Sequence, residues 1–268
     1  MVPTVLSGGC RIHYLVRGEG RTGVPPLLLL PGWGCDTASW GGLLDHLAAG
    51  RRCIAVEHRG SGASGRCRRL FGIATMADDA ARVLAALGVE RADVLGNSLG
   101  GMVGQALAVR HRARVRSLVL LSSSPGVGGV PSHPRLLLGA LRALSGRVRP
   151  RVAAGARANR RRFDPAQLGA TLGWFGPPVL SRIRVPTLVV HGSRDSVVPA
   201  INARLMARLI PRARLRILPD AGHLILDTHA GMVADAVTAF LDGLAPTAPP
   251  PATVTVAATK VAPASAAG

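Results

Sequence analysis

The chain has 268 residues, 48% of them hydrophobic, and carries a formal net charge of +19. This length and apolar content indicate one globular domain with a sizeable core and exclude a largely disordered chain. The charge comes almost entirely from arginine, which fits either an anionic partner or a GC-rich coding bias. Because these arginines are not interleaved with stacking aromatics, we expect no nucleic acid partner.

The N-terminal residues and the cysteines indicate a cytoplasmic protein. Residues 1–10 have no basic start followed by a long apolar run, as a secretory signal would, and no apolar run is long enough for a transmembrane segment. The four cysteines show no C-x-x-C spacing, so we expect reduced packing residues and neither a disulfide framework nor a metal site. They are Cys10, Cys35, Cys53 and Cys67.

The first part of the chain alternates short apolar runs with segments of helical spacing. Ser7-Gly8-Gly9 lies between two alternating segments and predicts a hairpin, while wholly apolar runs are typical of buried parallel strands. Thr75 and Asp78 form an expected capping box at the start of a helix. The expected elements are strands at 4–6, 12–16, 27–30 and 53–56 and helices near 39–49 and 75–87.

A short apolar run at 93–95 meets a helical run at 99–111 in the sequence Gly96-Asn97-Ser98-Leu99-Gly100. In this strand-to-helix context, G-x-S-x-G is typical of a nucleophile elbow, a strained turn that exposes the serine above the sheet. We expect Gly96 and Gly100 to be required because a Cβ at either position would collide with the neighbouring strand or helix. The alternative is a plain glycine-rich turn.

The alternation of strand and helix stops after a buried strand at 115–121. Residues 125–182 are rich in glycine, proline and arginine and include a helix-like piece at 135–144, so we predict a lid or cap insertion. This insertion divides the expected α/β core into residues 1–124 and 183–244.

The alternation then resumes and continues to residue 244. Residues 245–268, rich in alanine, proline and threonine without periodicity, predict a disordered tail. Strands that alternate with helices predict a mostly parallel central sheet with helices on both faces. The resumed elements are strands at 187–190 and 215–218 and helices at 199–209 and 229–244.

Two loops that follow strands carry partners for the serine. Asp195 ends His191-Gly192-Ser193-Arg194-Asp195, and His223 ends Pro219-Asp220-Ala221-Gly222-His223. A serine nucleophile needs a base, and the base needs a third group to orient it. The order Ser98, Asp195, His223 is the order of an α/β-hydrolase triad. Other candidates fit strand-end packing, caps or loops better: His191, His229, Asp220 and Asp227.

The tetrahedral intermediate of acyl transfer needs two backbone N–H donors for its oxyanion. Leu99, directly after the nucleophile, supplies one of them. The other is expected from Pro31-Gly32-Trp33-Gly34, in the loop after the strand at 27–30, where the donor is the amide of Trp33.

Together these motifs resemble α/β-hydrolase-fold serine hydrolases over residues 2–244. Within them the chain looks most like intracellular poly(3-hydroxyalkanoate) depolymerases. That likeness lies in Ser124-Pro125-Gly126-Val127-Gly128, in Asn202-x-Arg204-Leu205 and in Gly222-His223-Leu224-x-Leu226. The chain departs from such relatives at Pro31, where they commonly have histidine, and at Leu99, where we would expect an aromatic residue.

The resemblance implies hydrolysis of a carboxylic ester through an acyl-enzyme, with no cofactor and no metal. The implied substrate is a poly(3-hydroxyalkanoate) or its oligomers, stored in cytoplasmic granules whose anionic surface is a further expected partner. Four alternatives stay open: a general carboxylesterase or lipase, an acyl-CoA thioesterase, a cofactor-free perhydrolase and a non-catalytic member of the fold. Acyl transfer is disfavoured because polyester synthases use cysteine where this chain has Ser98.

Overall fold

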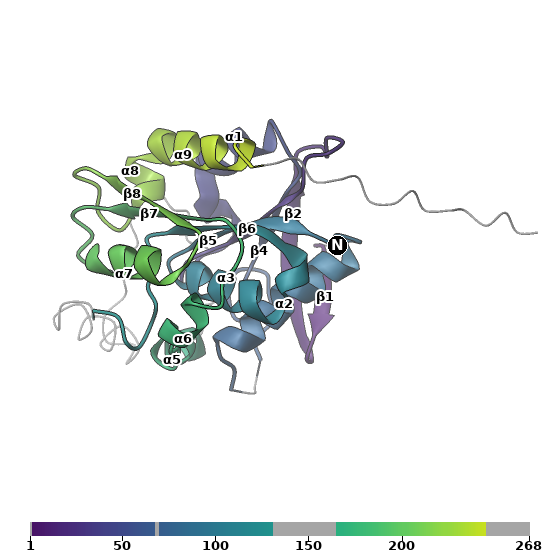
Figure 1. Ribbon diagram of the computed structural model, residues 1–268. Coiled ribbons are helices and arrows are strands. Elements are labelled where there is room, and N and C mark those ends of the chain that lie inside the picture. Colours follow the sequence, from purple (N-terminus) through teal and green to yellow (C-terminus); the bar gives the residue numbers. More distant parts are fainter. Residues whose placement is uncertain (1, 68–69, 131–164, 245–268) are drawn as a thin grey trace, which may run out of the picture.

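A mostly parallel sheet of eight strands forms the centre of the part of the chain that the structure describes, residues 2–67, 70–130 and 165–244 of a computed structural model (Figure 1). The strand order is β1-β2-β4-β3-β5-β6-β7-β8. The first two strands are antiparallel to their neighbours, and all the others pair in parallel. The strands are β1 Thr4–Ser7, β2 Cys10–Arg17, β3 Leu27–Leu30, β4 Cys53–Val56, β5 Ala92–Asn97, β6 Val115–Leu121, β7 Thr187–Gly192 and β8 Ala213–Leu218.

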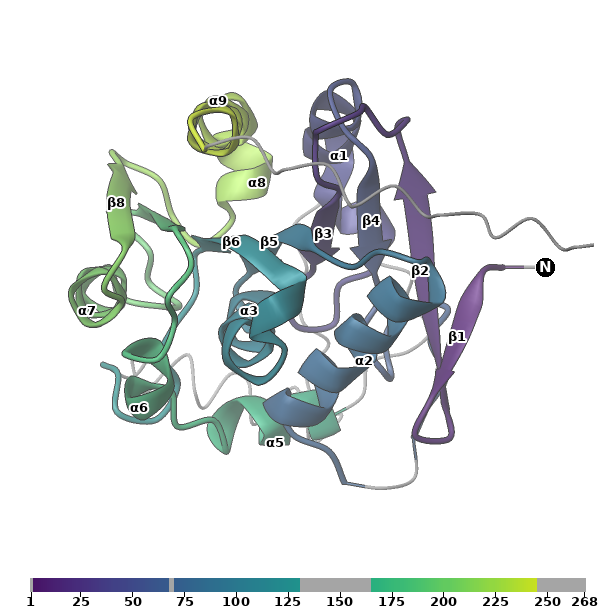
Figure 2. The ribbon, with the colours of Figure 1, turned by 45° about the vertical axis from the view of Figure 1, so that its right-hand side comes forward.

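Helices cover both faces of this sheet, as the alternating pattern predicts (Figure 2). Helices α1, α8 and α9 lie on one face, and α2, α3 and α7, together with α5 and α6, lie on the other. The helices are η1 Thr37–Trp40, α1 Gly41–Ala48, α2 Ile73–Ala86, α3 Leu99–Arg110, η2 Arg112–Arg114, α5 Ala166–Leu172, α6 Pro177–Leu180, α7 Ile201–Leu209, α8 Ile225–Thr228 and α9 Ala230–Asp242. No helix among the described residues is long and apolar enough to cross a bilayer.

The wholly apolar strands are explained by helices on both faces. In β3, Leu28 and Leu30 pack toward α2 and α3, while Leu27 and Leu29 pack toward α1 and α9. Because a strand projects alternate side chains to opposite faces, every position of β3 is buried and every position is leucine. These central strands end at one edge of the sheet, where the predicted site lies.

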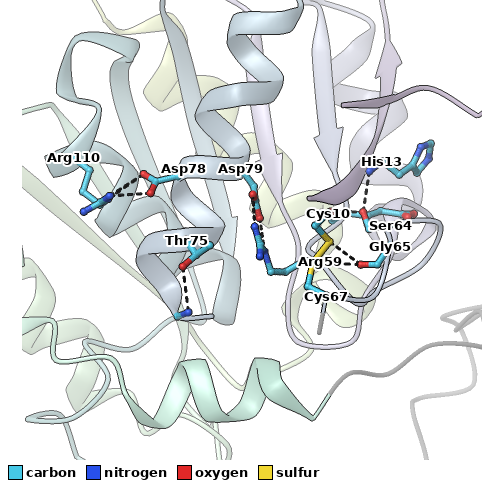
Figure 3. A network of polar contacts seen from close by, with 12 residues as sticks. Cys10, His13, Arg59, Ser64, Gly65, Cys67, Thr75, Asp78, Asp79 and Arg110 are labelled. Atoms are coloured by element: carbon cyan, nitrogen blue, oxygen red, sulfur yellow. Dashed lines mark hydrogen bonds and ion pairs between the residues drawn. A yellow bond between two sulfur atoms is a disulfide. The ribbon is translucent and has the colours of Figure 1, made fainter. Parts of the chain in front are cut away.

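A disulfide joins Cys10 and Cys67, so the prediction that the cysteines are all reduced is wrong for this pair (Figure 3). Cys10 opens β2, and the loop after β4 returns to β2, where the amide of Gly65 donates to the carbonyl of Arg11 at 2.7 Å. The two cysteines are 57 residues apart in sequence. Their proximity arises from the pairing of β2 with β4, and short-range spacing does not reveal it. The remaining two cysteines are free thiols.

The start of α2 also differs from the prediction. The helix begins after its N-cap residue, Gly72, whose amide donates to the hydroxyl of Thr75 at 3.4 Å. Asp78 takes no part in the cap, because it pairs with Arg110 at 2.8 Å (Figure 3). It also lies 2.7 Å from His111, and both partners are more than 30 residues away in sequence. A tertiary ion pair therefore replaces the expected capping box.

The predicted insertion at 125–182 is described at both ends, by residues 125–130 and by the segment that holds α5 and α6. The side chain of Asn202 on α7 holds the start of this segment, because its Oδ1 accepts from the amide of Val130 at 2.7 Å and its Nδ2 donates to the carbonyl of Val130 at 2.8 Å. The helix-like piece at 135–144 and the tail at 245–268 lie outside the described residues, and the domain division stays a prediction.

Candidate active site

Ser98 occupies a strained turn between the end of β5 and the start of α3. Its φ is 51°, in the left-handed region that non-glycine residues rarely adopt. A Cβ at Gly96 would overlap the backbone of Gly100, and a Cβ at Gly100 would overlap the carbonyl of Leu30. The turn is held by the amide of Ser98, which donates to the carbonyl of Leu121 at 2.8 Å. Glycine is thus a steric requirement on both sides of the serine.

The three residues predicted as a triad lie in one hydrogen-bonded chain. His223 Nε2 is 3.2 Å from Ser98 Oγ, and His223 Nδ1 is 2.8 Å from Asp195 Oδ2. Each residue follows a strand, β5, β7 or β8, so the parallel sheet brings them to one edge. The side chain of His223 is 17% exposed and that of Asp195 is 0% exposed, so the base reaches solvent while the acid is sealed.

Asp195 is surrounded by donors. Its Oδ1 accepts from the amides of Val197 at 2.9 Å and Val198 at 2.7 Å, and its Oδ2 also lies 3.2 Å from Nε2 of His191. Burial by itself would raise the pKa of Asp195, but the hydrogen bonds from His191, His223 and Val198 outweigh it and hold the pKa well below the usual range. The carboxylate therefore stays ionised beside the base.

His191 is buried, as the sequence predicts, and it also contacts the carboxylate of Asp195, which the sequence does not indicate. It is completely buried, and its Nε2 lies 2.8 Å from the carbonyl of Val198 and 3.2 Å from Asp195 Oδ2. Because that carbonyl only accepts, Nε2 carries the proton. One feature of the sequence is compatible with this contact: His191 lies near the end of the strand that leads into the loop of Asp195, four residues before it.

The loop after β3 lies beside the nucleophile. A Cβ at Gly32 would be 3.6 Å from the Cβ of Ser98. His58 Nε2 donates to the carbonyl of Pro31 at 3.1 Å, and the amide of Gly34 donates to Gln167 Oε1 at 3.1 Å. The position of this loop suits the predicted donor role of Trp33. The roles of Trp33 and Leu99 stay predictions.

The alternative acids and bases have other contacts. Asp220 pairs with Arg194 at 2.8 Å on the surface, and His229 precedes α9 and contacts Thr228 at 2.8 Å. Within the described ranges, no group of three histidine, cysteine or acidic side chains is placed to hold a metal ion. The expectation that neither a metal nor a cofactor takes part stays a prediction.

The chain is similar to known hydrolases over most of its length. The profile of the alpha/beta hydrolase fold family matches residues 25–178 and 173–230. A poly(3-hydroxyalkanoate) depolymerase of Ectopseudomonas oleovorans is 32% identical over 86% of this chain and 88% of its own. A 2-hydroxymuconate semialdehyde hydrolase of a Pseudomonas strain is 30% identical over 88% and 92%. The solved enol-lactonase of Burkholderia xenovorans has a TM-score of 0.77 at 25% identity, covering 90% of this chain and 100% of its own.

Proposed function

The chain belongs to the α/β-hydrolase family, a family of hydrolytic enzymes, and from this premise we propose that it is a serine hydrolase that cleaves carboxylic esters. The observation that carries the proposal is the position of His223, whose two ring nitrogens contact Ser98 Oγ and Asp195 Oδ2. This arrangement supplies a nucleophile, a base and an orienting acid. Acyl transfer to water further needs donors for the oxyanion, for which we propose the amides of Trp33 and Leu99.

The reaction proceeds through an acyl-enzyme. His223 Nε2 takes the proton of Ser98 as Oγ attacks the ester carbonyl, and the buried carboxylate of Asp195 stabilises the imidazolium that forms. The amides of Trp33 and Leu99 hold the oxyanion. The leaving alcohol takes the proton from His223, after which His223 activates water in the same way. Hydrolysis of the acyl-enzyme then returns Ser98 to its starting state.

We propose a poly(3-hydroxyalkanoate) or its oligomers as substrate. Support comes from the depolymerase that is 32% identical over 86% of this chain. The Asn202-x-Arg204-Leu205 motif gives less support for the substrate, because Asn202 bonds the backbone of Val130 and so has a structural reason to be present. General carboxylesterase or acyl-CoA thioesterase activity is the alternative, and the similarity to a solved lactonase, an enzyme of cyclic esters, supports the first of these. The cytoplasmic, granule-associated location stays a prediction, and the disulfide between Cys10 and Cys67 removes the argument from the cysteines for it.

Replacing Ser98 with alanine tests the mechanism. We expect kcat on p-nitrophenyl esters to fall roughly 10⁴- to 10⁶-fold, and fluorophosphonate labelling to disappear. Near wild-type turnover by the Ser98→Ala protein would contradict the role of Ser98 as the nucleophile.

The same preparation tests the substrate. The wild-type protein should clear a suspension of amorphous polyester granules and sediment with them, and the Ser98→Ala protein should sediment without clearing. Brisk cleavage of p-nitrophenyl esters or acyl-CoA without clearing would replace the polyester proposal by the alternative.

A further inference from the structure

Gln167 connects two loops at the site. It lies on α5 and is completely buried. Its Oε1 accepts from the amide of Gly34 at 3.1 Å, and its Nε2 donates to the carbonyl of Arg59 at 2.8 Å and to Ser61 Oγ at 2.7 Å. One side chain therefore joins the loop after β3 to the loop after β4.

The chemistry of these partners determines which way the amide points. The carbonyl of Arg59 can only accept, so Nε2 of Gln167 must face it, and the amide of Gly34 can only donate, so Oε1 must face that side. A flipped amide would set donor against donor and acceptor against acceptor. Gln167 thus fits its place in a single orientation.

The hydrogen bond to Gly34 acts next to the expected oxyanion donor. The N–H of Trp33 belongs to the peptide group between Gly32 and Trp33, whose carbonyl accepts from the amide of Cys35 at 3.2 Å. The peptide group before it is held by His58 through the carbonyl of Pro31, and the one after it is held by Gln167 through the amide of Gly34. The Trp33 amide therefore lies between two fixed peptide groups.

We propose that Gln167 is a positioning residue for the oxyanion hole, acting through Gly34 on the Trp33 amide. The inference rests on the proposed ester hydrolysis. Donors in an oxyanion hole work only when they lie at hydrogen-bond distance from the oxyanion, so a shift of the loop lowers the rate of the chemical step. Substrate binding in the ground state does not depend on that distance in the same way.

The test compares Gln167→Met with Gln105→Met. Both glutamines are completely buried, but Gln105 bonds the carbonyl of Ser124 at 3.0 Å and Trp174 Nε1 at 3.2 Å, away from the loop after β3. We expect Gln167→Met to lower kcat on p-nitrophenyl butyrate about 10- to 100-fold with little change in KM. The affinity for an alkyl trifluoromethyl ketone, which mimics the tetrahedral intermediate, should fall by a similar factor. Gln105→Met should keep both values close to wild type.

Two results would overturn the inference. One is an unchanged kcat in Gln167→Met, and the other is a lower kcat with unchanged affinity for the ketone. If Gln167→Met does not fold, Gln167→Ala replaces it, since the smaller side chain fits the space and also removes the acceptor for the amide of Gly34; its kcat should be reduced, and an unchanged value again refutes the role.

Failure of the proposed function is a separate outcome. In that case the wild-type protein would hydrolyse no ester in a way that depends on Ser98. The rate of fluorophosphonate labelling at Ser98, which also develops charge on an oxygen, then still distinguishes Gln167→Met from Gln105→Met. Slower labelling in Gln167→Met alone supports the positioning role, and equal labelling in both contradicts it.

Discussion

Replacing Asp195 with asparagine tests how the carboxylate controls the base. Its two oxygens have different partners: Oδ1 accepts from two backbone amides, at 2.7 and 2.9 Å, and Oδ2 faces two histidines, His223 Nδ1 at 2.8 Å and His191 Nε2 at 3.2 Å. An asparagine can keep its oxygen only on the side of the backbone donors. Its NH₂ group must then face His223.

This orientation forces the wrong tautomer on the base. With a donor facing it, Nδ1 of His223 must accept, so the ring proton moves to Nε2, the nitrogen that lies 3.2 Å from Ser98 Oγ. A protonated Nε2 cannot take the serine proton. The expected loss in kcat is about 10⁴-fold, which corresponds to about 5 kcal/mol of transition-state stabilisation.

The assay is steady-state hydrolysis of a p-nitrophenyl ester at neutral pH. The matched control is Asp220→Asn, because Asp220 lies near His223 in sequence but pairs with Arg194 on the surface. Asp195→Asn should fold, since its oxygen retains both backbone bonds, and Asp220→Asn should match wild type. A near wild-type kcat in Asp195→Asn, or a large loss in Asp220→Asn, would refute the assignment of Asp195.

Two further predictions concern stability. Burial lowers the pKa of His58 to about 4, partly offset by its hydrogen bond to Pro31, whereas the unfolded chain takes up the proton near pH 6.5. Urea unfolding should therefore show up to about 3 kcal/mol of stability lost as the pH falls from about 6.5 to about 4, and His58→Gln should flatten this decline; an equal decline in both proteins would contradict it. The bond between Cys10 and Cys67 spans 57 residues, so Cys67→Ser should lower the free energy of unfolding by about 4 kcal/mol relative to the oxidised wild type. Thiol titration of the denatured, unreduced protein should count two thiols, and a count of four would show that the bond does not form.

The central strands and the serine turn could be predicted because short-range sequence determines them. A run such as Leu27–Leu30 is buried on both faces, so its composition alone indicates a central parallel strand. The turn at Ser98 requires glycine at fixed offsets, which the sequence displays directly. Parallel strands end at one edge, so Asp195 and His223 could be expected near Ser98 once their strands were identified.

The features that were missed depend on contacts between distant parts of the chain. Gln167 is 133 residues from Gly34, and nothing in the sequence around either residue indicates the hydrogen bond between them. Cys10 and Cys67 meet only because β2 pairs with β4. The sequence predicts a packed histidine at position 191, and His191 is buried, but the sequence does not show that its Nε2 faces the carboxylate of Asp195.

Two buried amides hold the chain on either side of residues 131–164. Asn202 holds Val130 before this segment, and Gln167 holds the chain shortly after it, so both junctions are bonded to the core. We expect a graft of the corresponding stretch from a relative with another substrate to keep both anchors, and a changed substrate preference in the graft would assign that preference to the exchanged residues.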